Sequence, residues 1–270
     1  MGAIAIRHNA GMLLAVDVGN TNVTIGVFKG DALVHHWRLA ALHERTADEL
    51  GIFVTRLFEQ TKVDISAVHG IVIASVVPPL TRPMEEMSDR YFGQRALLVD
   101  ASNAGIPIKY FPASDVGADR IVNALAAREK YGRASPLIVV DFGTGTTFDV
   151  ISREGEYVGE IICPGIDISA DALFEHAARL PRVDVRKPDA VIGQTTVNAM
   201  QSGLFFGYVE MVDGLVRRIK GELPEGDRAI VIATGGLADV LSAETHTIQH
   251  VEPNLTLDGL RLIWQRNQRT

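Results

Sequence analysis

The sequence has a single cysteine, few aromatic residues and no long hydrophobic run. Cys163 is the one cysteine among 270 residues, which excludes an internal disulfide framework and is typical of a reducing compartment. No apolar stretch approaches the ~20 residues of a membrane span. Residues 1–11 are too short and too weakly apolar for a signal peptide. We therefore expect a cytoplasmic protein that does not span a membrane.

Positive charge is also scarce. Acidic residues outnumber basic ones, and the net charge is −7. This balance argues against nucleic acid or an anionic membrane surface as the main partner. The chain is 47% hydrophobic and 22% charged, as expected for a globular protein with a sizeable core. Its length suits one large domain or two of ordinary size.

One pattern of hydrophobic periodicity occurs twice in the chain. Residues 12–40 read as three consecutive strands, with a hairpin turn before the last, and residues 137–164 repeat this order. We therefore predict an α/β protein with two related lobes, at residues 12–132 and 133–270. Each lobe has a mixed sheet that begins in a β-meander and is flanked by helices, and a cleft lies between the lobes.

Apolar residues at helical spacing follow each group of predicted strands. Thr46 and Glu49 have the spacing of a capping box, which predicts a helix that begins beside Thr46. Further helices are expected over residues 81–93, 118–132, 167–180, 198–223, 237–242 and 256–268.

A cluster of small polar residues separates the first two predicted strands. Gly19 lets backbone N–H groups approach an anion without a Cβ in the way. Asn20, Thr21 and Asn22 add neutral hydrogen-bond donors. Asp17 would repel a phosphate directly, so a metal or its water shell suits it better. The alternative is a hairpin in which the Asp and Asn side chains form only an Asx-turn.

The second copy strengthens the phosphate interpretation. Gly143 and Gly145 offer backbone approach, Thr144 offers a hydroxyl, and Asp141 is the matching carboxylate. Two such hairpins, one per lobe, can hold a polyphosphate from opposite sides of a cleft.

A third glycine element follows a later strand. Gly235 and Gly236 stand between an apolar strand and a helix, where they permit close approach of an adenine or ribose. The alternative is an ordinary strand-to-helix turn. A Walker A lysine motif is absent, and no G-x-G-x-x-G lies at a strand–helix junction, so P-loop and dinucleotide-binding classes fit poorly.

Together these residues resemble the acetate/sugar kinase, Hsp70 and actin superfamily and, within it, the type III pantothenate kinases. The motifs include "DVGNTN", "SVVPP", "VGADRIVNA", "DFGTGTT", "TTVNAMQSG" and "ATGGLA", and the resemblance extends from about Met12 to the C-terminus. It implies two ribonuclease H-like, actin-like ATPase lobes. It also implies ATP-dependent phosphorylation of the pantothenate 4′-hydroxyl, the first step towards coenzyme A.

The resemblance further implies cofactors and partners. It implies Mg²⁺ with ATP, a monovalent cation (K⁺ or NH₄⁺), and a homodimer with the substrate pocket near its interface. It assigns Asp119 as catalytic base and Asp141 as the metal ligand. The implied ATP-binding residues are Asp17, Val18, Gly19, Asn20, Thr21, Asn22, Val23, Thr24, Thr144, Gly235 and Gly236. The implied pantothenate-binding residues are Tyr110, Gly117, Ala118, Asp119, Arg120 and Thr196.

The chemistry of two adjacent residues suits this activity. Asp119 stands near the start of a predicted helix, whose dipole favours its ionised form. Such a weak base would orient the hydroxyl and accept its proton late in the transfer. The alternative is a helix N-cap. Arg120 can clamp the one carboxylate of pantothenate with two parallel hydrogen bonds, or else form an ion pair with an acid such as Asp115.

The chain departs from the family pattern at three places. Residues 1–11 lie outside it, Gly145 replaces the usual alanine, and Cys163 replaces a common threonine. Two other functions stay open: a kinase or phosphatase of the same superfamily with another substrate, and a non-catalytic nucleotide-binding regulator.

Overall fold

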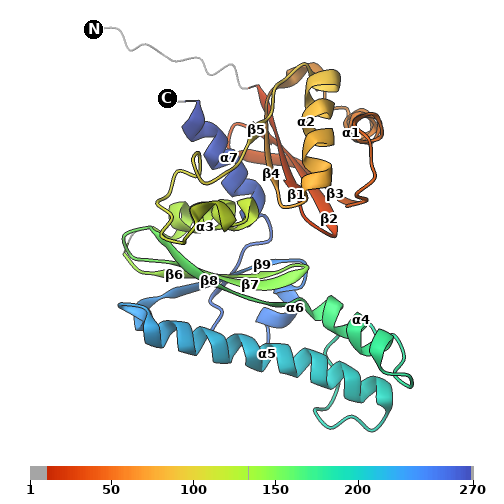
Figure 1. The fold of residues 1–270 in the computed structure, drawn as a ribbon, viewed down its shortest axis with the longest axis vertical. Helices are drawn as coiled ribbons and strands as arrows, with labels where there is room; N and C mark the ends of the chain where they lie inside the picture. The colour runs from red at the N-terminus through yellow and green to blue at the C-terminus, as the bar shows by residue number, and fades with distance from the viewer. Residues whose placement is uncertain (1–10, 133, 269–270) are drawn as a thin grey trace. The chain divides into compact units, whose positions relative to one another are not determined.

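The structure, a computed structural model, describes residues 11–132 and 134–268. Contacts divide the chain into two compact units, and each unit is built from segments that are separated in the sequence (Figure 1). Among the described residues, the first unit contains residues 11–105, 117–122 and 256–268, and the second contains residues 106–116, 123–132 and 134–255. The lobes expected at residues 12–132 and 133–270, and the cleft between them, stay predictions.

The sheet of the first unit has five strands in the order β3-β2-β1-β4-β5. β1, β2 and β3 form an antiparallel meander, whereas β4 and β5 continue the sheet in parallel with β1. The strands are β1 (Met12–Val18), β2 (Asn22–Lys29), β3 (Ala32–Ala40), β4 (Val68–Ser75) and β5 (Leu97–Leu98). The predicted meander and its turn before β3 are therefore confirmed.

Three helices and the first residues of α3 (Ala118–Tyr131) complete the first unit, and the starts of two of these helices have a visible cause. The three helices are α1 (Ala47–Thr61), α2 (Pro78–Phe92) and α7 (Leu255–Asn267), of which all but the first residue lies in this unit. The capping box is confirmed, since Thr46 and Glu49 each bind the other's backbone N–H. α2 begins at Pro78, earlier than the expected residue 81, because proline suits the first helical positions. A Cβ at Gly70 would lie 2.1 Å from the Trp264 ring, so glycine lets α7 approach the sheet.

The second unit repeats this topology strand for strand. Its order is β10-β9-β6-β7-β8, with β6, β7 and β8 as the antiparallel meander and β9 and β10 in parallel with β6. The strands are β6 (Leu137–Phe142), β7 (Gly145–Ile151), β8 (Tyr157–Pro164), β9 (Ile230–Gly235) and β10 (His250–Val251). β10 was not predicted, because two residues carry no detectable periodicity.

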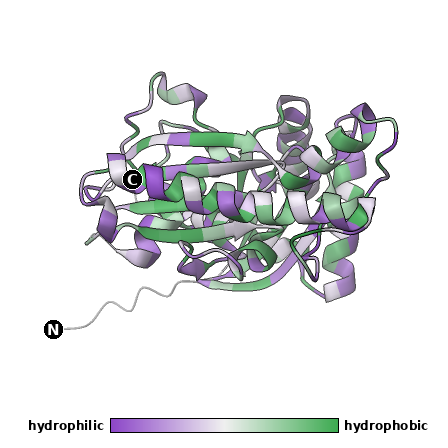
Figure 2. Ribbon diagram, turned by 90° about the horizontal axis from the view of Figure 1, so that it is seen from below, coloured by the Kyte–Doolittle hydropathy of each residue, from purple (hydrophilic) through white to green (hydrophobic). Residues whose placement is uncertain are grey.

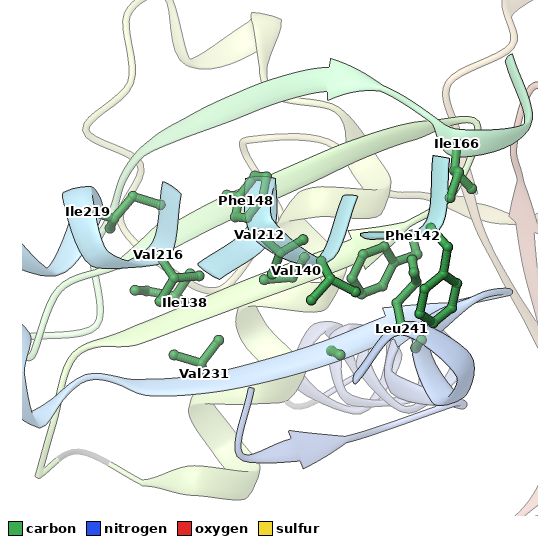
Figure 3. Packing of buried hydrophobic residues seen from close by; sticks show 14 of the residues in the cluster. Ile138, Val140, Phe142, Phe148, Ile166, Val212, Val216, Ile219, Val231 and Leu241 are labelled. Atoms are coloured by element: carbon green, nitrogen blue, oxygen red, sulfur yellow. The ribbon is translucent and has the colours of Figure 1, made fainter. Parts of the chain in front are cut away.

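The helices of the second unit are α4 (Ile166–His176), α5 (Thr196–Glu222) and α6 (Ala238–Ser242), together with residues 123–131 of α3 (Ala118–Tyr131). Figure 3 shows α5 against the sheet, with Val212 and Val216 beside Val140 and Ile138. Alternate residues of β6 therefore face α5. α4 ends at His176, earlier than the expected residue 180, and an irregular segment follows to residue 195.

Hydropathy follows this division into sheets and helices. Strands are mostly apolar in Figure 2, whereas helices alternate apolar and polar residues, as expected when each has one face on a sheet. Two mixed five-stranded sheets flanked by helices confirm the predicted α/β class. Among the helices that the structure describes, none has the length and apolarity of a membrane span.

Candidate active site

The first polar turn joins β1 to β2 and contains Gly19, Asn20 and Thr21. The Gly19 N–H donates to the Asn22 carbonyl at 3.0 Å, which closes the turn. Asn20 and Thr21 are both exposed to solvent. The Thr21 carbonyl accepts a hydrogen bond from Ala41 N–H at 2.9 Å, which ties the turn to the end of β3.

Asp17 lies one residue before the end of β1. It is half-buried and stands opposite Thr24 on β2 and Ala74 on β4. The other residues predicted to bind ATP here fall at these strand ends. Val18 and Val23 form the last pair of the ladder, and both side chains are buried. Their predicted contribution therefore comes from the backbone.

The second polar turn joins β6 to β7 through Gly143 and Thr144. The Gly143 N–H donates to the Gly145 carbonyl at 3.1 Å, and the Gly165 N–H donates to the Thr144 carbonyl at 3.0 Å. Thr144 is exposed. A Cβ at Gly165 would lie 2.2 Å from the Thr144 carbonyl oxygen, so glycine is required for this contact.

Asp141 occupies the position in β6 that Asp17 occupies in β1. It stands opposite Thr147 on β7 and Thr234 on β9. Its Oδ2 accepts a hydrogen bond from Asn123 Nδ2 at 3.1 Å. Asn123 is fully buried in α3 and was not among the predicted site residues. It lies in the "VGADRIVNA" motif, which was the available signal.

Gly235 ends β9 beside this carboxylate. Its φ is +95°, a conformation that favours glycine, and a Cβ there would lie 2.5 Å from Asp141 Oδ1. The next N–H, of Gly236, donates to the Phe142 carbonyl at 3.1 Å. The predicted adenine or ribose contact of Gly235 and Gly236 stays a prediction. The structure adds a role that the sequence did not indicate, which is clearance for Asp141.

Asp119 lies in the first turn of α3. Its Oδ1 accepts a hydrogen bond from the Arg120 backbone N–H at 2.9 Å, as expected for a carboxylate at a helix N-terminus. The Arg120 N–H and the Ile121 N–H both lie 3.1 Å from the Gly117 carbonyl. A Cβ at Gly117 would lie 2.5 Å from Asp119 Oδ1, so this glycine also makes room beside a carboxylate oxygen.

A short segment after β4 links Asp119 to the first turn within the first unit. The Val76 N–H donates to the Val18 carbonyl at 3.1 Å. The Val76 side chain would lie 3.3 Å from a Cβ at Gly117. Residues 75–79 are the "SVVPP" motif, for which no role was predicted. The structure shows that this motif places the start of α3 beside the end of β1.

The remaining predicted substrate-binding residues lie apart in the chain. Ala118 is buried at the start of α3, whereas Arg120 is half-buried. Tyr110 is half-buried in the segment 106–116 of the second unit. Thr196 is exposed as the first residue of α5, directly after the N-cap Thr195.

Two observations limit the metal and thiol chemistry of the site. Across residues 11–132 and 134–268, no group of three or more His, Cys, Asp or Glu side chains could hold a metal ion. A cation at Asp17 or Asp141 would therefore have at most two His, Cys, Asp or Glu side chains among its ligands. Burial raises the pKa of the Cys163 thiol above its ordinary value, which disfavours the reactive thiolate.

Comparisons with known proteins show what the chain as a whole is similar to. A family model described as type III pantothenate kinase matches residues 13–218. The type III pantothenate kinase of Koribacter versatilis is 48% identical over 268 residues, which cover 95% of this chain and 96% of that protein. The one from Geobacter sulfurreducens is 49% identical and covers 95% and 100%. The ethanolamine utilization protein EutJ from Carboxydothermus hydrogenoformans shares the fold, with a TM-score of 0.53, 14% identity, and 93% and 89% coverage.

Proposed function

We propose roles for the residues of this site from one premise: the chain belongs to the type III pantothenate kinase family. It is a kinase that uses ATP to phosphorylate the 4′-hydroxyl of pantothenate, the first step of coenzyme A synthesis. Phosphoryl transfer requires alignment and charge neutralisation more than covalent participation by the protein. The proposal therefore concerns which residues align the reactants and which neutralise charge.

The two polar turns bind the ATP phosphates in this proposal. The residues from Asp17 to Thr24 supply backbone and side-chain donors from the first unit, and Thr144 supplies a hydroxyl from the second. The exposed Asn20, Thr21 and Thr144 side chains support this assignment. Gly235 and Gly236 contact the adenosine part of ATP.

Asp119 orients the pantothenate hydroxyl and accepts its proton late in the transfer. The hydrogen bond from the Arg120 N–H stabilises the ionised carboxylate. The carboxylate is therefore too weak a base to remove the proton in advance. It becomes an effective acceptor as the bond to phosphorus forms and the hydroxyl becomes acidic.

Arg120 binds the pantothenate carboxylate through two parallel hydrogen bonds. Tyr110, Gly117, Ala118 and Thr196 complete the substrate pocket. An ion pair of Arg120 with Asp115 is the alternative role.

A monovalent cation, K⁺ or NH₄⁺, is held by Asp141, and Mg²⁺ enters with ATP near Asp17. The donor set fits a cation at Asp141, because its Oδ1 and the Phe142 carbonyl oxygen lie side by side, 2.5 and 2.6 Å from where a Cβ of Gly235 would stand. The bound cations neutralise phosphate charge.

The functional form is a homodimer in the cytoplasm. Apolar side chains are exposed on β8, α4 and the segment before α5, where a single chain gains nothing from them. They are Ile162, Ile168, Leu173, Phe174, Val191 and Ile192. Thr196, just beyond this segment, then lies where a second subunit can approach the substrate.

One observation carries the proposal: the same hairpin with an aspartate before it and a threonine within it occurs in both units. ADP release from ATP, measured with and without pantothenate in KCl and in NaCl, tests it. We expect release that depends on pantothenate and is faster in KCl. Release with another hydroxyl acceptor would indicate a different kinase. No release with any acceptor would indicate a regulator.

A further inference from the structure

We propose that Asn123 is a positioning residue, which orients the Asp141 carboxylate and so sets the affinity of the enzyme for its monovalent cation. This inference rests on the proposed role of Asp141. The hydrogen bond from Asn123 Nδ2 to Asp141 Oδ2, at 3.1 Å, is its starting point.

The two oxygens of Asp141 have different surroundings. Oδ2 accepts the Asn123 amide, whereas Oδ1 faces the positions where Gly235 and Gly143 lack a Cβ. A Cβ at Gly235 would lie 2.5 Å from Oδ1 and 2.6 Å from the Phe142 carbonyl oxygen, so glycine lets these two oxygens lie close to the end of β9. Oδ2 is thus bonded to α3, while Oδ1 lies beside a second oxygen of the kind that a cation requires.

The register neighbours of Asp141 direct their hydroxyls elsewhere. Thr234 Oγ1 donates to the Glu252 carbonyl at 2.8 Å, and Thr147 Oγ1 donates to Asp149 Oδ2 at 3.5 Å. Asn123 comes instead from a helix and is 0% exposed, so its side chain is held by packing. A buried amide with a fixed donor is suited to hold a carboxylate in one rotamer.

The position of Asn123 in its helix is also informative. Asp119 precedes Asn123 by four residues in α3, so the two side chains lie on the same face of the helix, one turn apart. The helix that carries the proposed base therefore also holds the proposed cation ligand. Loss of the Asn123 amide should weaken the cation site first and leave the binding of pantothenate nearly unchanged.

Asn123→Ala and Asn123→Leu test the inference, since leucine keeps most of the side-chain volume if alanine unfolds the protein. We expect the half-activating K⁺ concentration to rise ~10- to 100-fold, the range for hydrogen-bond partners of metal ligands. The KM for pantothenate at saturating K⁺ should change less than ~3-fold. Melting temperature gives a readout other than activity. KCl should raise the melting temperature of the wild-type complex with a non-hydrolysable ATP analogue. The Asn123 variants should need a higher KCl concentration for the same rise, by the same factor as their half-activating K⁺ concentration.

Gln201→Ala is the matched control. Gln201 is another buried amide of the second unit, and its Nε2 donates to the Asp184 carbonyl at 3.1 Å. This variant should lose stability without any change in half-activating K⁺. If the Asn123 variants keep the wild-type K⁺ dependence and only melt earlier, the inference is wrong while the role of Asp141 stands. If the wild type itself is indifferent to K⁺, both fail.

Discussion

The two units have the same sheet but differ at the residues beside their aspartates. In both, a meander of three strands is continued by two parallel strands, and the aspartate stands opposite a threonine, Thr24 or Thr147. In both, the residue after the third strand donates its N–H to the threonine carbonyl of the turn. This bond fixes the turn because its donor directly follows the third strand of the meander.

The neighbouring parallel strand makes the difference. Val18 in the first unit stands opposite Ser75, and Phe142 in the second stands opposite Gly235. Ser75 Oγ lies 2.8 Å from Thr81 Oγ1 and helps to begin α2, whereas Gly235 lets the Asp141 carboxylate pack directly against the end of β9. One repeated scaffold thus offers two different environments to equivalent carboxylates. This is the physical reason to expect different tasks for Asp17 and Asp141.

The largest expected effect distinguishes the roles of Asp119 and Asp141. These two carboxylates each lie beside a glycine. Asp119→Asn should lower kcat by roughly 100- to 10,000-fold at every K⁺ concentration, because the amide accepts no proton. Asp141→Asn should instead raise the K⁺ requirement and recover partly in high KCl. Steady-state kinetics across a KCl series distinguish them. Asp115 is an exposed carboxylate three residues before the start of α3. The kcat of Asp115→Asn should remain within a few-fold of wild type.

If Asp119→Asn stays within a few-fold of wild type, its role is limited to the helix terminus. If Asp115→Asn instead raises the KM for pantothenate strongly, Arg120 depends on an ion pair with Asp115.

We expect a smaller effect from replacing the residue whose N–H binds the threonine carbonyl of each turn, which is Gly165 in the second unit and Ala41 in the first. Gly165→Ala should destabilise the protein by about 2 kcal/mol, because the new Cβ would overlap the Thr144 carbonyl. It should also raise the KM for ATP by displacing Thr144. Ala41→Gly, at the matching position of the first unit, should cost less than about 1 kcal/mol. Urea unfolding and ATP kinetics measure both. Equal losses would contradict the inferred difference between the turns.

The smallest effect concerns pH and compares Glu252 in the second unit with Glu49 in the first. Burial raises the pKa of Glu252, but hydrogen bonds from Lys130 and Tyr131 outweigh it, and the pKa lies below 4.5. Hydrogen bonds from Thr46 lower the pKa of Glu49, which is exposed. A lowered pKa means that each group stabilises the fold above about pH 4.5 and loses this contribution as the pH falls through the folded-state pKa.

Thermal unfolding of Glu252→Gln and Glu49→Gln from pH 7 to pH 3 measures this difference. Glu252→Gln should reduce stability at pH 7 by less than about 1 kcal/mol, because the group is partly exposed, and should show a shallower acid loss than wild type. Glu49→Gln should change the profile less. A steeper acid loss in Glu252→Gln would reverse the assigned sign.

Most of the fold could be predicted from the sequence. Alternation of apolar residues located both meanders, and Thr46 with Glu49 located the start of α1. The boundaries that failed have local causes: α2 begins early because Pro78 suits the first helical turn, and β10 is too short to show a period. The candidate site could be predicted only in part. Asp17, Asp119 and Asp141 stand in recognisable motifs, but Asn123 reads as one polar residue within the apolar stretch 121–127 of its helix.

By itself, the sequence determined the two polar turns, because glycine, threonine and aspartate at the ends of apolar strands carry their chemistry within a few residues. Only the tertiary structure decided what lies beside each carboxylate. The Asn123 amide reaches Asp141 from a helix, Gly235 on a neighbouring strand permits close packing of its carboxylate, and Val76 sets the start of α3 beside β1. These contacts join residues far apart in the chain, and their geometry follows from sheet register and helix packing, which no local pattern encodes.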